Sequence, residues 1–157
     1  MSDVKIRANF GNLKNYQKRL LKAFSGNEDR VDADKFFKDV LNTAAQRTLY
    51  GAEQRTPVDT GQLRKNWKMT SATKRGWNYA ADVENPVEYA SYVEFGHRPN
   101  WRNIKKDKPN KGKLKFNGKS AWVEGSFMLT KAIDETRQNM PSLVNEKINK
   151  LRRELES

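Results

Sequence analysis

The spacing of apolar residues changes at Pro57, and this change constrains the fold more than any other feature of the chain. From Asp32 to Thr56, apolar and small residues recur every three or four positions, which predicts one long amphipathic helix. Asp32 suits the N-cap, with Val31 and Phe36 placed to form a hydrophobic staple. Pro57 ends the helix, because the residue before a proline is pushed out of helical conformation. The predicted buried stripe is Phe37, Val40, Leu41, Ala44, Thr48 and Ala52.

Beyond Pro57 the pattern has the period of two that is typical of half-buried strands. Alternating residues at 67–71 and 77–83 flank a turn at Lys74-Arg75-Gly76, which predicts an antiparallel hairpin. A similar alternation at 4–8 predicts an N-terminal strand. Residues 88–95 form a candidate short helix closed by Gly96, since glycine accepts the left-handed conformation found just past helix ends.

Helical spacing returns near both ends of the chain. Leu13, Leu20 and Phe24 predict a helix from about Phe10 to Phe24. Near the C-terminus one helical face is expected to carry Trp122, Ser126, Leu129 and Ile133. Pro141 is expected to start another helix, whose narrow apolar stripe is Val144, Ile148, Leu151 and Leu155. We therefore expect an α+β fold in a single domain, residues 1–157. A small antiparallel sheet, made of the hairpin at about 64–84 and the N-terminal strand, would pack with long helices.

The net charge of +12 is concentrated in one segment. Nine lysines and arginines against the single Asp107 give residues 98–119 a local charge of +8, and the rest of the chain shares about +4. Prolines and glycines in the same stretch predict a long basic loop at about 97–120, with a short hairpin around 114–116. Loops of this length in a compact domain are usually functional or disordered.

The basic loop has two functional interpretations. Its cations could contact DNA phosphates, with Trp101 and Phe116 available for stacking, or the loop could order against an acidic protein partner. A solvated loop is the third alternative, and charge does not separate the three. The candidate contact residues are Arg98, Trp101, Arg102, Lys105, Lys106, Lys108, Lys111, Lys113, Lys115 and Lys119.

Catalytic and metal-binding patterns are weak. The chain has no cysteine, and its only histidine is His97, which is better interpreted as a contact at the loop boundary than as a general base. The acidic residues Asp82, Glu84, Glu88 and Glu94 lie close in sequence but lack EF-hand spacing, and facing solvent or pairing with lysines suits them better. No phosphate-cradling glycine loop is present. We expect no enzyme activity, no cofactor, no bound metal and no membrane contact.

Two further sets of residues attract attention. The segment at 89–97 should expose some of its aromatic side chains if the short helix lies at an edge, and exposed aromatics commonly anchor interfaces. Its candidate contact residues are Tyr89, Tyr92, Glu94, Phe95 and His97. The run TPVDTGQLR is expected to be a structural hinge between the long helix and the hairpin, made by Pro57, Asp59, Thr60, Gly61 and Leu63.

Three motifs in order, TPVDTGQLR from Thr56, YASYVEFGH from Tyr89 and WVEGSFML from Trp122, resemble a family of small proteins of long-tailed bacteriophages. These are tail-completion or head–tail joining proteins, also described as neck or minor tail components. The resemblance implies a virion structural protein, assembled in the host cytoplasm, that contacts other connector and tail proteins. It also implies a homo-oligomeric ring, with six subunits as one expected number, whose basic loop could meet DNA in the channel. A stand-alone basic nucleic-acid-binding module is the alternative, and a DNA-processing enzyme ranks third.

Overall fold

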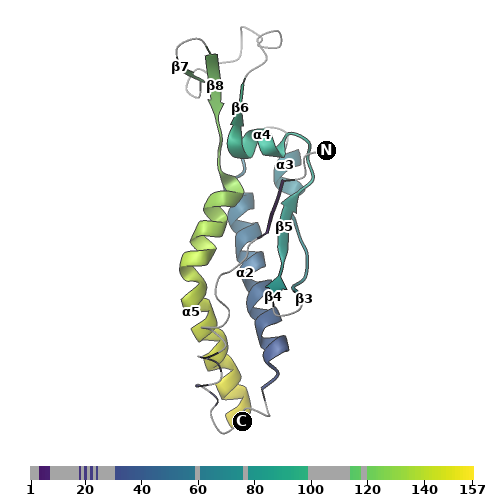
Figure 1. Cartoon of the computed structure of the whole chain (residues 1–157), viewed down its shortest axis with the longest axis vertical. Helices are drawn as coiled ribbons and strands as arrows, with labels where there is room; N and C mark the ends of the chain where they lie inside the picture. The colour runs from purple at the N-terminus through teal and green to yellow at the C-terminus, as the bar shows by residue number, and fades with distance from the viewer. Residues whose placement is uncertain are drawn as a thin grey trace.

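The architecture is α+β, as predicted: two long helices pack together and against small antiparallel sheets. The computed structural model describes residues 4–7, 18, 20, 22, 24, 31–58, 61–75, 78–98, 114–117 and 120–157. Figure 1 shows an elongated molecule in which α2 (Ala33–Arg55) and α5 (Met128–Glu156) lie side by side. The C-terminus lies at one end, and the strands β7 (Leu114–Asn117) and β8 (Ser120–Glu124) lie at the other.

Helix α2 has the boundaries that the sequence predicts. The Asp32 carboxylate accepts a hydrogen bond from the Lys35 backbone N–H at 3.0 Å, which identifies the N-cap. The helix ends at Arg55, and Thr56 before Pro57 has extended backbone angles. Phe36 is buried and Val31 packs partly buried against the core, as the hydrophobic staple requires. Every residue of the predicted stripe is buried.

Helix α5 corrects two predictions. Pro141 lies inside one continuous helix of 29 residues and starts no new helix. Trp122 belongs to β8, so it shares no helical face with Ile133, and Ser126 also precedes the helix. A proline in a helix interior costs about 3 kcal/mol because it removes a hydrogen bond and crowds the preceding turn. Buried apolar residues on both sides of Pro141 offset this cost by packing against α2 and the rest of the core; they are Met140, Leu143, Val144 and Ile148.

The two long helices approach closely at Gly51. A Cβ atom there would lie 3.1 Å from the Ala132 Cβ, so the neighbouring atoms would have to shift by a few tenths of an ångström to admit it. Nearby, the buried hydroxyls of Thr48 and Thr136 are hydrogen bonded across the interface at 2.9 Å. Three ion pairs also cross the helix pair: Arg47–Glu146, Arg55–Glu135 and Lys147–Asp39.

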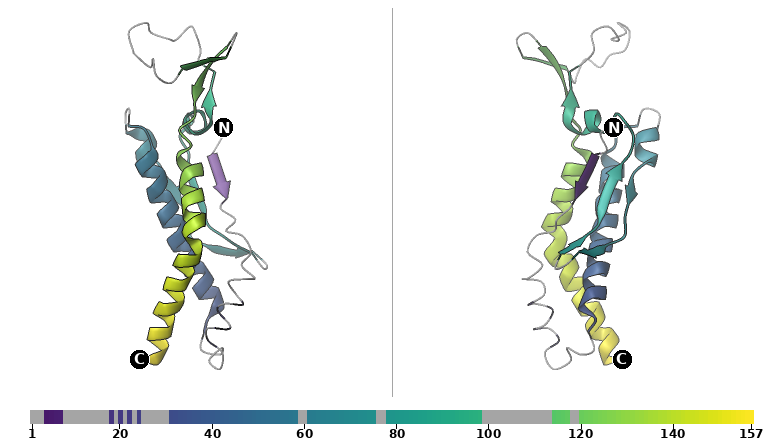
Figure 2. Two further views of the ribbon diagram at one scale, coloured as in Figure 1. Left: turned by 90° about the vertical axis from the view of Figure 1, so that its left-hand side faces the viewer. Right: turned by 45° about the vertical axis from the view of Figure 1, so that its right-hand side comes forward.

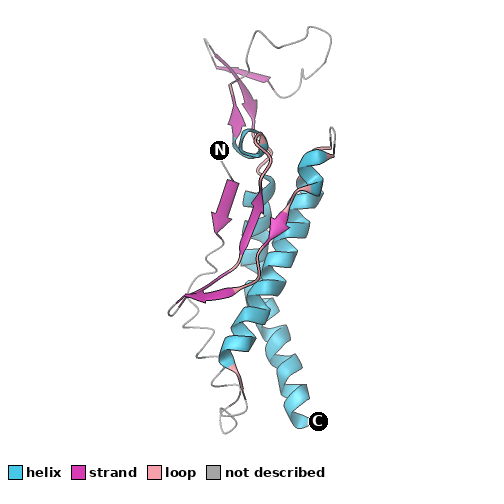
Figure 3. Cartoon of the chain, turned by 90° about the vertical axis from the view of Figure 1, so that its right-hand side faces the viewer, coloured by secondary structure: helices cyan, strands magenta, loops and turns pink. Residues whose placement is uncertain are grey.

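The main sheet has the strand order β1-β5-β2, with β1 at Val4–Arg7, β5 at Asp82–Asn85 and β2 at Lys68–Met69. All its pairs are antiparallel, and Val83 is opposite both Ile6 and Met69. The predicted N-terminal strand and its place in the sheet are therefore confirmed. The sheet runs alongside the helices (Figure 3).

The predicted hairpin is confirmed as antiparallel, but it is divided into two sheets. β3 (Thr73–Arg75) pairs with β4 (Asn78–Ala80) in a separate ribbon. Between β2 and β3, the Ala72 N–H donates to the Asn42 side chain of α2 at 2.7 Å. Trp77 and Gly76 lie outside the described residues.

The third sheet, in the order β6-β8-β7, includes both ends of the predicted basic loop. β6 (Gly96–His97) pairs with the end of β8, and β7 pairs with β8 as the expected short hairpin around 114–116. The hairpin expected around 114–116 is therefore confirmed, whereas the loop prediction is wrong at 97 and at 120, which belong to β6 and β8. Residues 99–113, 118 and 119 lie outside the described part. In both views of Figure 2 this sheet stands beyond the ends of α2 and α5.

Little of the predicted N-terminal helix is described. Leu20 and Phe24 are buried, and the Phe24 N–H donates to the Leu20 carbonyl at 3.1 Å, with helical spacing. The other residues at 10–24 that support that prediction lie outside the described set, apart from 18 and 22. Within the described residues, the structure contains no helix with enough length and apolar character to cross a membrane.

Candidate functional site

The motif after α2 is a set of buried contacts, which we call the clasp: Thr56, Leu63, Arg64, Trp67 and Asn85. The buried Trp67 indole N–H donates to the Thr56 hydroxyl at 2.8 Å, and that hydroxyl donates to the Ala52 carbonyl at 2.7 Å. Arg64 donates to the Thr56 carbonyl at 3.2 Å, and Asn85 donates to the Leu63 carbonyl at 2.7 Å. The clasp thereby ties the end of α2 to the short helix α3 (Gln62–Lys65) and to β5.

The predicted hinge residues are partly described. Gly61 is the N-cap of α3 and has a φ of 74°, so the expected left-handed glycine is present. Leu63 is buried in the core and Pro57 is exposed. The predicted capping roles of Asp59 and Thr60 fall outside the described residues. Sequence reasoning missed that Thr56, Arg64 and Trp67 interact, although their polar groups within one motif were a usable signal.

Helix α4 (Ala90–Phe95) carries the predicted aromatic surface, and it begins two residues later than predicted. Tyr89, Tyr92 and Phe95 are 39%, 58% and 50% exposed, as the edge position implies. The Tyr92 and His97 rings meet edge to face at 5.7 Å between centroids. The half-buried His97 has no hydrogen-bond partner for Nδ1 among the described residues.

Glu94 was predicted to face solvent or a partner, but its side chain is only 1% exposed and is buried within the protein. Its carboxylate accepts hydrogen bonds from the Leu129 and Thr130 backbone N–H groups at 3.0 and 2.9 Å and from the Thr130 hydroxyl at 2.7 Å. A carboxylate at a helix N-terminus is stabilised by the unpaired N–H groups and by the helix dipole. Glu94 therefore joins α4 to α5, and we remove it from the candidate contact surface.

The chain crosses itself beside α4, where Gly96 and Gly125 meet. A Cβ on Gly96 would lie 2.4 Å from the Val123 carbonyl oxygen, and one on Gly125 would lie 2.3 Å from the Glu94 carbonyl oxygen. Gly96 has φ 82° and ψ 170°, an extended glycine conformation and not the predicted left-handed helical one. Backbone N–H groups of Ser126 and Phe127 bond to α4 carbonyls at 2.7 and 3.0 Å. Both residues of the crossing must therefore lack side chains.

Most of the basic segment is not among the described residues. Arg98 is exposed at the end of β6, and Lys115 belongs to β7. The remaining predicted contact residues, Trp101, Arg102, Lys105, Lys106, Lys108, Lys111, Lys113 and Lys119, fall outside the described ranges. Their predicted contacts with DNA or an acidic partner stay predictions.

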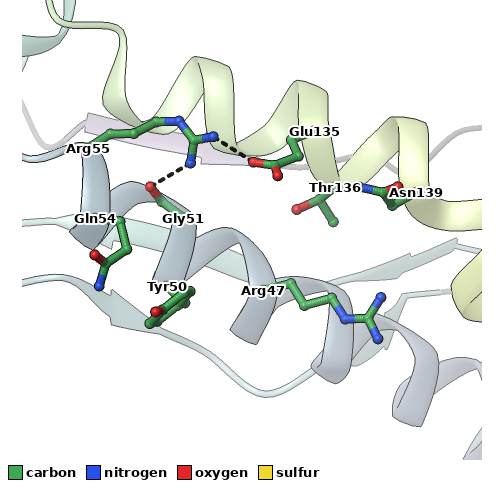
Figure 4. Close-up of a pocket in the computed structure, with 8 residues that line it drawn as sticks. All are labelled: Arg47, Tyr50, Gly51, Gln54, Arg55, Glu135, Thr136 and Asn139. Atoms are coloured by element: carbon green, nitrogen blue, oxygen red, sulfur yellow. Dashed lines mark hydrogen bonds and ion pairs between the residues drawn. The ribbon is translucent and has the colours of Figure 1, made fainter.

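Two shallow hollows lie elsewhere, among the residues that the structure describes. One of about 280 Å³ lies between α2 and α5, with the Arg55–Glu135 ion pair at one end and Arg47 toward the other (Figure 4). Tyr50 projects there and is 63% exposed. The residues that line this first hollow are Arg47, Tyr50, Gly51, Gln54, Arg55, Glu135, Thr136 and Asn139. The other, of about 360 Å³, is lined by Gln62, Asn66, Pro86, Val87, Glu88 and Tyr89.

An exposed polar cluster connects the start of α2 to the β3–β4 ribbon. The Lys74 ammonium lies 2.8 Å from the Asp34 carboxylate, and the Tyr79 hydroxyl bonds to the same carboxylate. These hydrogen bonds, Lys74 first, hold the pKa of Asp34 below its ordinary value. The bond to Asp34 raises the pKa of Lys74, and burial followed by the Asp34 bond raises that of Tyr79. The cluster is a structural contact with no group poised for proton transfer near neutral pH.

The described residues therefore offer contact surfaces more clearly than a site for chemistry. They contain no group of three or more histidines and carboxylates placed to hold a metal ion. Trp122 and Phe127, exposed aromatics beside α4, were missed as contact residues, since Trp122 was assigned to a helical face and Phe127 to no surface. The signal available was two aromatics flanking Gly125 in the third motif.

Comparisons with known proteins are consistent with this picture. Residues 18–96, about half of the chain, match a family model described as "Bacteriophage HK97-gp10, putative tail-component". The match covers α2, the clasp and α4. No curated protein and no solved structure matches the chain.

Proposed function

Since the chain belongs to the HK97-gp10-like family of bacteriophage tail components, we propose that it acts in tail completion or head–tail joining. It is a structural component, and its work is to bind other proteins of the tail or neck. We further propose that it forms a homo-oligomeric ring, with six subunits as the first number to test. Its place of action would be the virion neck or tail, after assembly in the host cytoplasm.

The aromatic surface of α4 is the observation that supports this proposal. Tyr92 and Phe95 expose half or more of their surface, whereas other aromatic residues of the chain, such as Phe37 and Trp67, are buried in the core. Large aromatics that are exposed and held on a fixed backbone are frequent energetic anchors of interfaces. The Glu94 carboxylate and the glycine crossing fix this backbone from the inner side. We therefore assign Tyr89, Tyr92, Phe95 and His97 to a contact with another subunit or tail protein.

The basic segment has a separate proposed role. It begins at Arg98, directly after this surface, includes β7 and leads to β8. In a ring, several copies would bring their local charges of +8 together and form a positive collar. That collar would face either DNA in the channel or an acidic partner ring.

The test is the double variant Tyr92→Ala/Phe95→Ala in a phage whose own copy has been deleted. Removing two interface anchors costs about 2 kcal/mol or more each, so the joined fraction of particles in electron micrographs should fall at least about tenfold. The matched control is Tyr50→Ala, which removes an exposed aromatic from α2. Circular dichroism should show that both variants fold.

Normal joining by the double variant would remove α4 as an interface. Light scattering of the purified chain with neighbouring tail proteins gives the ring size directly. A salt-dependent affinity of the isolated monomer for duplex DNA, lost when Lys105, Lys106, Lys108 and Lys111 are neutralised, would favour the alternative, a stand-alone nucleic-acid-binding module.

A further inference from the structure

We propose that Phe127 and Trp122 form a second contact surface, which takes a protein whose apolar patch is bordered by acidic side chains. We call it the crossing surface, because both residues flank the Gly96–Gly125 crossing. The inference rests on the proposed function, since the partner is taken to be another protein of the phage particle. It assigns a role to the third sequence motif, WVEGSFML from Trp122, none of whose residues belongs to α4 or to the clasp.

The backbone of Phe127 gives the first reason. Its φ of 50° and ψ of 46° are left-handed, and it is the only residue other than glycine with a positive φ in the described part of the chain. This conformation is unfavourable for an L-residue, and a bulky side chain there is an outlier. Glycine and asparagine are the residues that normally occupy such positions.

The fold explains the conformation but not the side chain. The Phe127 N–H donates to the Glu94 carbonyl at 3.0 Å, and two residues later the Leu129 N–H donates to the Glu94 carboxylate at 3.0 Å. The chain must reverse between these two bonds as it enters α5, and one residue with positive φ achieves that. An asparagine at position 127 would make the same turn with less strain, so the turn itself does not require the phenyl ring.

The ring also gains only partial burial. Phe127 is 37% exposed and Trp122 is 43% exposed. The Trp122 indole nitrogen would be 2.9 Å from a Cβ on Gly96, so the indole lies directly over the crossing. Both rings are thus held on a backbone that the two glycines lock in place. Rigid aromatic side chains that stay partly in solvent are the type of residue that anchors protein interfaces.

The charges nearby favour an acidic partner. The Lys131 ammonium lies 5.9 Å from the centre of the Phe127 ring, and the first turn of α5 has no acidic residue. β8, which carries Trp122, pairs with β6, and the segment 98–119 with its local charge of +8 follows β6 directly in the sequence. Charge complementarity therefore predicts carboxylates around the apolar patch of the partner.

A protein fits this surface better than duplex DNA does. Aromatic rings contribute to nucleic-acid binding mainly by stacking on unpaired bases, which a duplex does not present. The surface therefore suits an apolar patch with an acidic border.

The test is a series of three variants, Phe127→Asn, Phe127→Ala and Phe127→Tyr, each measured for Tm and for co-sedimentation with heads and, separately, tails of a phage that lacks this protein. Phe127→Asn should raise the Tm by about 2–4 °C, because it relieves the left-handed strain, while its affinity for the particle falls at least about tenfold. Phe127→Ala should bind as poorly, with a Tm below that of Phe127→Asn. Phe127→Tyr should keep the wild-type Tm and binding.

Charge provides a second measurement. Lys131→Glu should weaken co-sedimentation more than Lys131→Gln, and wild-type binding should weaken as salt is raised. A Tm lowered by several degrees in Phe127→Asn would show that the ring serves the fold and would overturn the proposal. Equal binding by Phe127→Asn and the wild type would also overturn it, and so would an affinity for duplex DNA that Phe127→Asn abolishes.

The two proposals fail differently. A wild-type chain that binds neither heads nor tails overturns both. If Phe127→Asn binds normally while Tyr92→Ala/Phe95→Ala blocks joining, only the crossing surface is lost. The reverse result removes the α4 surface and keeps the crossing surface.

Discussion

The clasp and the crossing each hold a tryptophan, but the two indole rings lie in opposite environments. At the clasp, Trp67 is buried and its indole N–H is bonded to Thr56. At the crossing, Trp122 and Phe127 remain partly exposed while the backbone is packed as tightly as glycine permits. An aromatic residue in a distinctive motif therefore stabilises the fold where it is buried and hydrogen bonded, and remains available to a partner where it is exposed.

The largest expected loss of stability comes from adding a methyl group to Gly125 of the crossing, and Gly61 near the clasp serves as the comparison. In Gly125→Ala the new Cβ would lie within 3 Å of three backbone atoms at 94–96, which cannot move aside cheaply, so we expect a loss of about 3 kcal/mol or more. Gly61→Ala would meet only an ordinary van der Waals contact, with the nearest atom 3.9 Å away, and bears only the left-handed penalty of about 1–2 kcal/mol. Urea unfolding of both variants measures the difference, and equal losses would contradict the tight crossing.

A smaller effect is expected from Thr56→Val at the clasp. The variant keeps the shape but leaves the buried Trp67 N–H without its acceptor, which costs about 1–3 kcal/mol. Thr56→Ser is the matched control, because it keeps the hydroxyl. Adding Trp67→Phe to Thr56→Val should recover part of the loss in a double-mutant cycle. Additive losses would show that this bond does not stabilise the clasp.

The smallest expected change in stability concerns the Asp34–Lys74–Tyr79 cluster. Like the clasp it is a polar contact to α2, but it is exposed. The pKa of Asp34 is lowered in the fold, so the unfolded chain binds more protons over the window just below the ordinary carboxyl value of about 3.9. The contribution of Asp34 is therefore complete above that value and is lost as pH falls through the lower folded pKa. Asp34→Asn should flatten the stability profile below about pH 4 and leave the slope at neutral pH unchanged. An unchanged acid slope in thermal melts across pH 2–5 would refute this assignment.

Local patterns predicted the fold well where one element buries one face. Asp32, the α2 stripe and the N-terminal strand all followed from period and capping. The errors arose where tertiary packing overrides a local rule. Pro141 lies within α5 because packing along the whole of α2 outweighs the cost of the proline. The helix predicted from Trp122 failed because this residue lies in β8, whose end pairs with the distant residues Gly96 and His97, and periodicity does not report such pairing.

The candidate site was only partly accessible from the sequence. The exposure of Tyr92 and Phe95 followed from the expected edge position of their helix. Glu94 was misplaced because an acidic residue between aromatics suggests solvent, whereas its partners are backbone N–H groups 35 and 36 residues away. The strain at Phe127 also depends on that distant pairing, so no local sequence rule could have indicated it.

The elongated shape has a practical consequence for imaging. The last residue, Ser157, lies at the opposite end of the molecule from β7 and β8 (Figure 1). A gold cluster or a fluorescent protein fused after Ser157 would therefore stand well clear of both aromatic surfaces and should leave their binding intact. In micrographs of labelled particles, the position of the fusion relative to the head would show which way the subunit points along the tail axis.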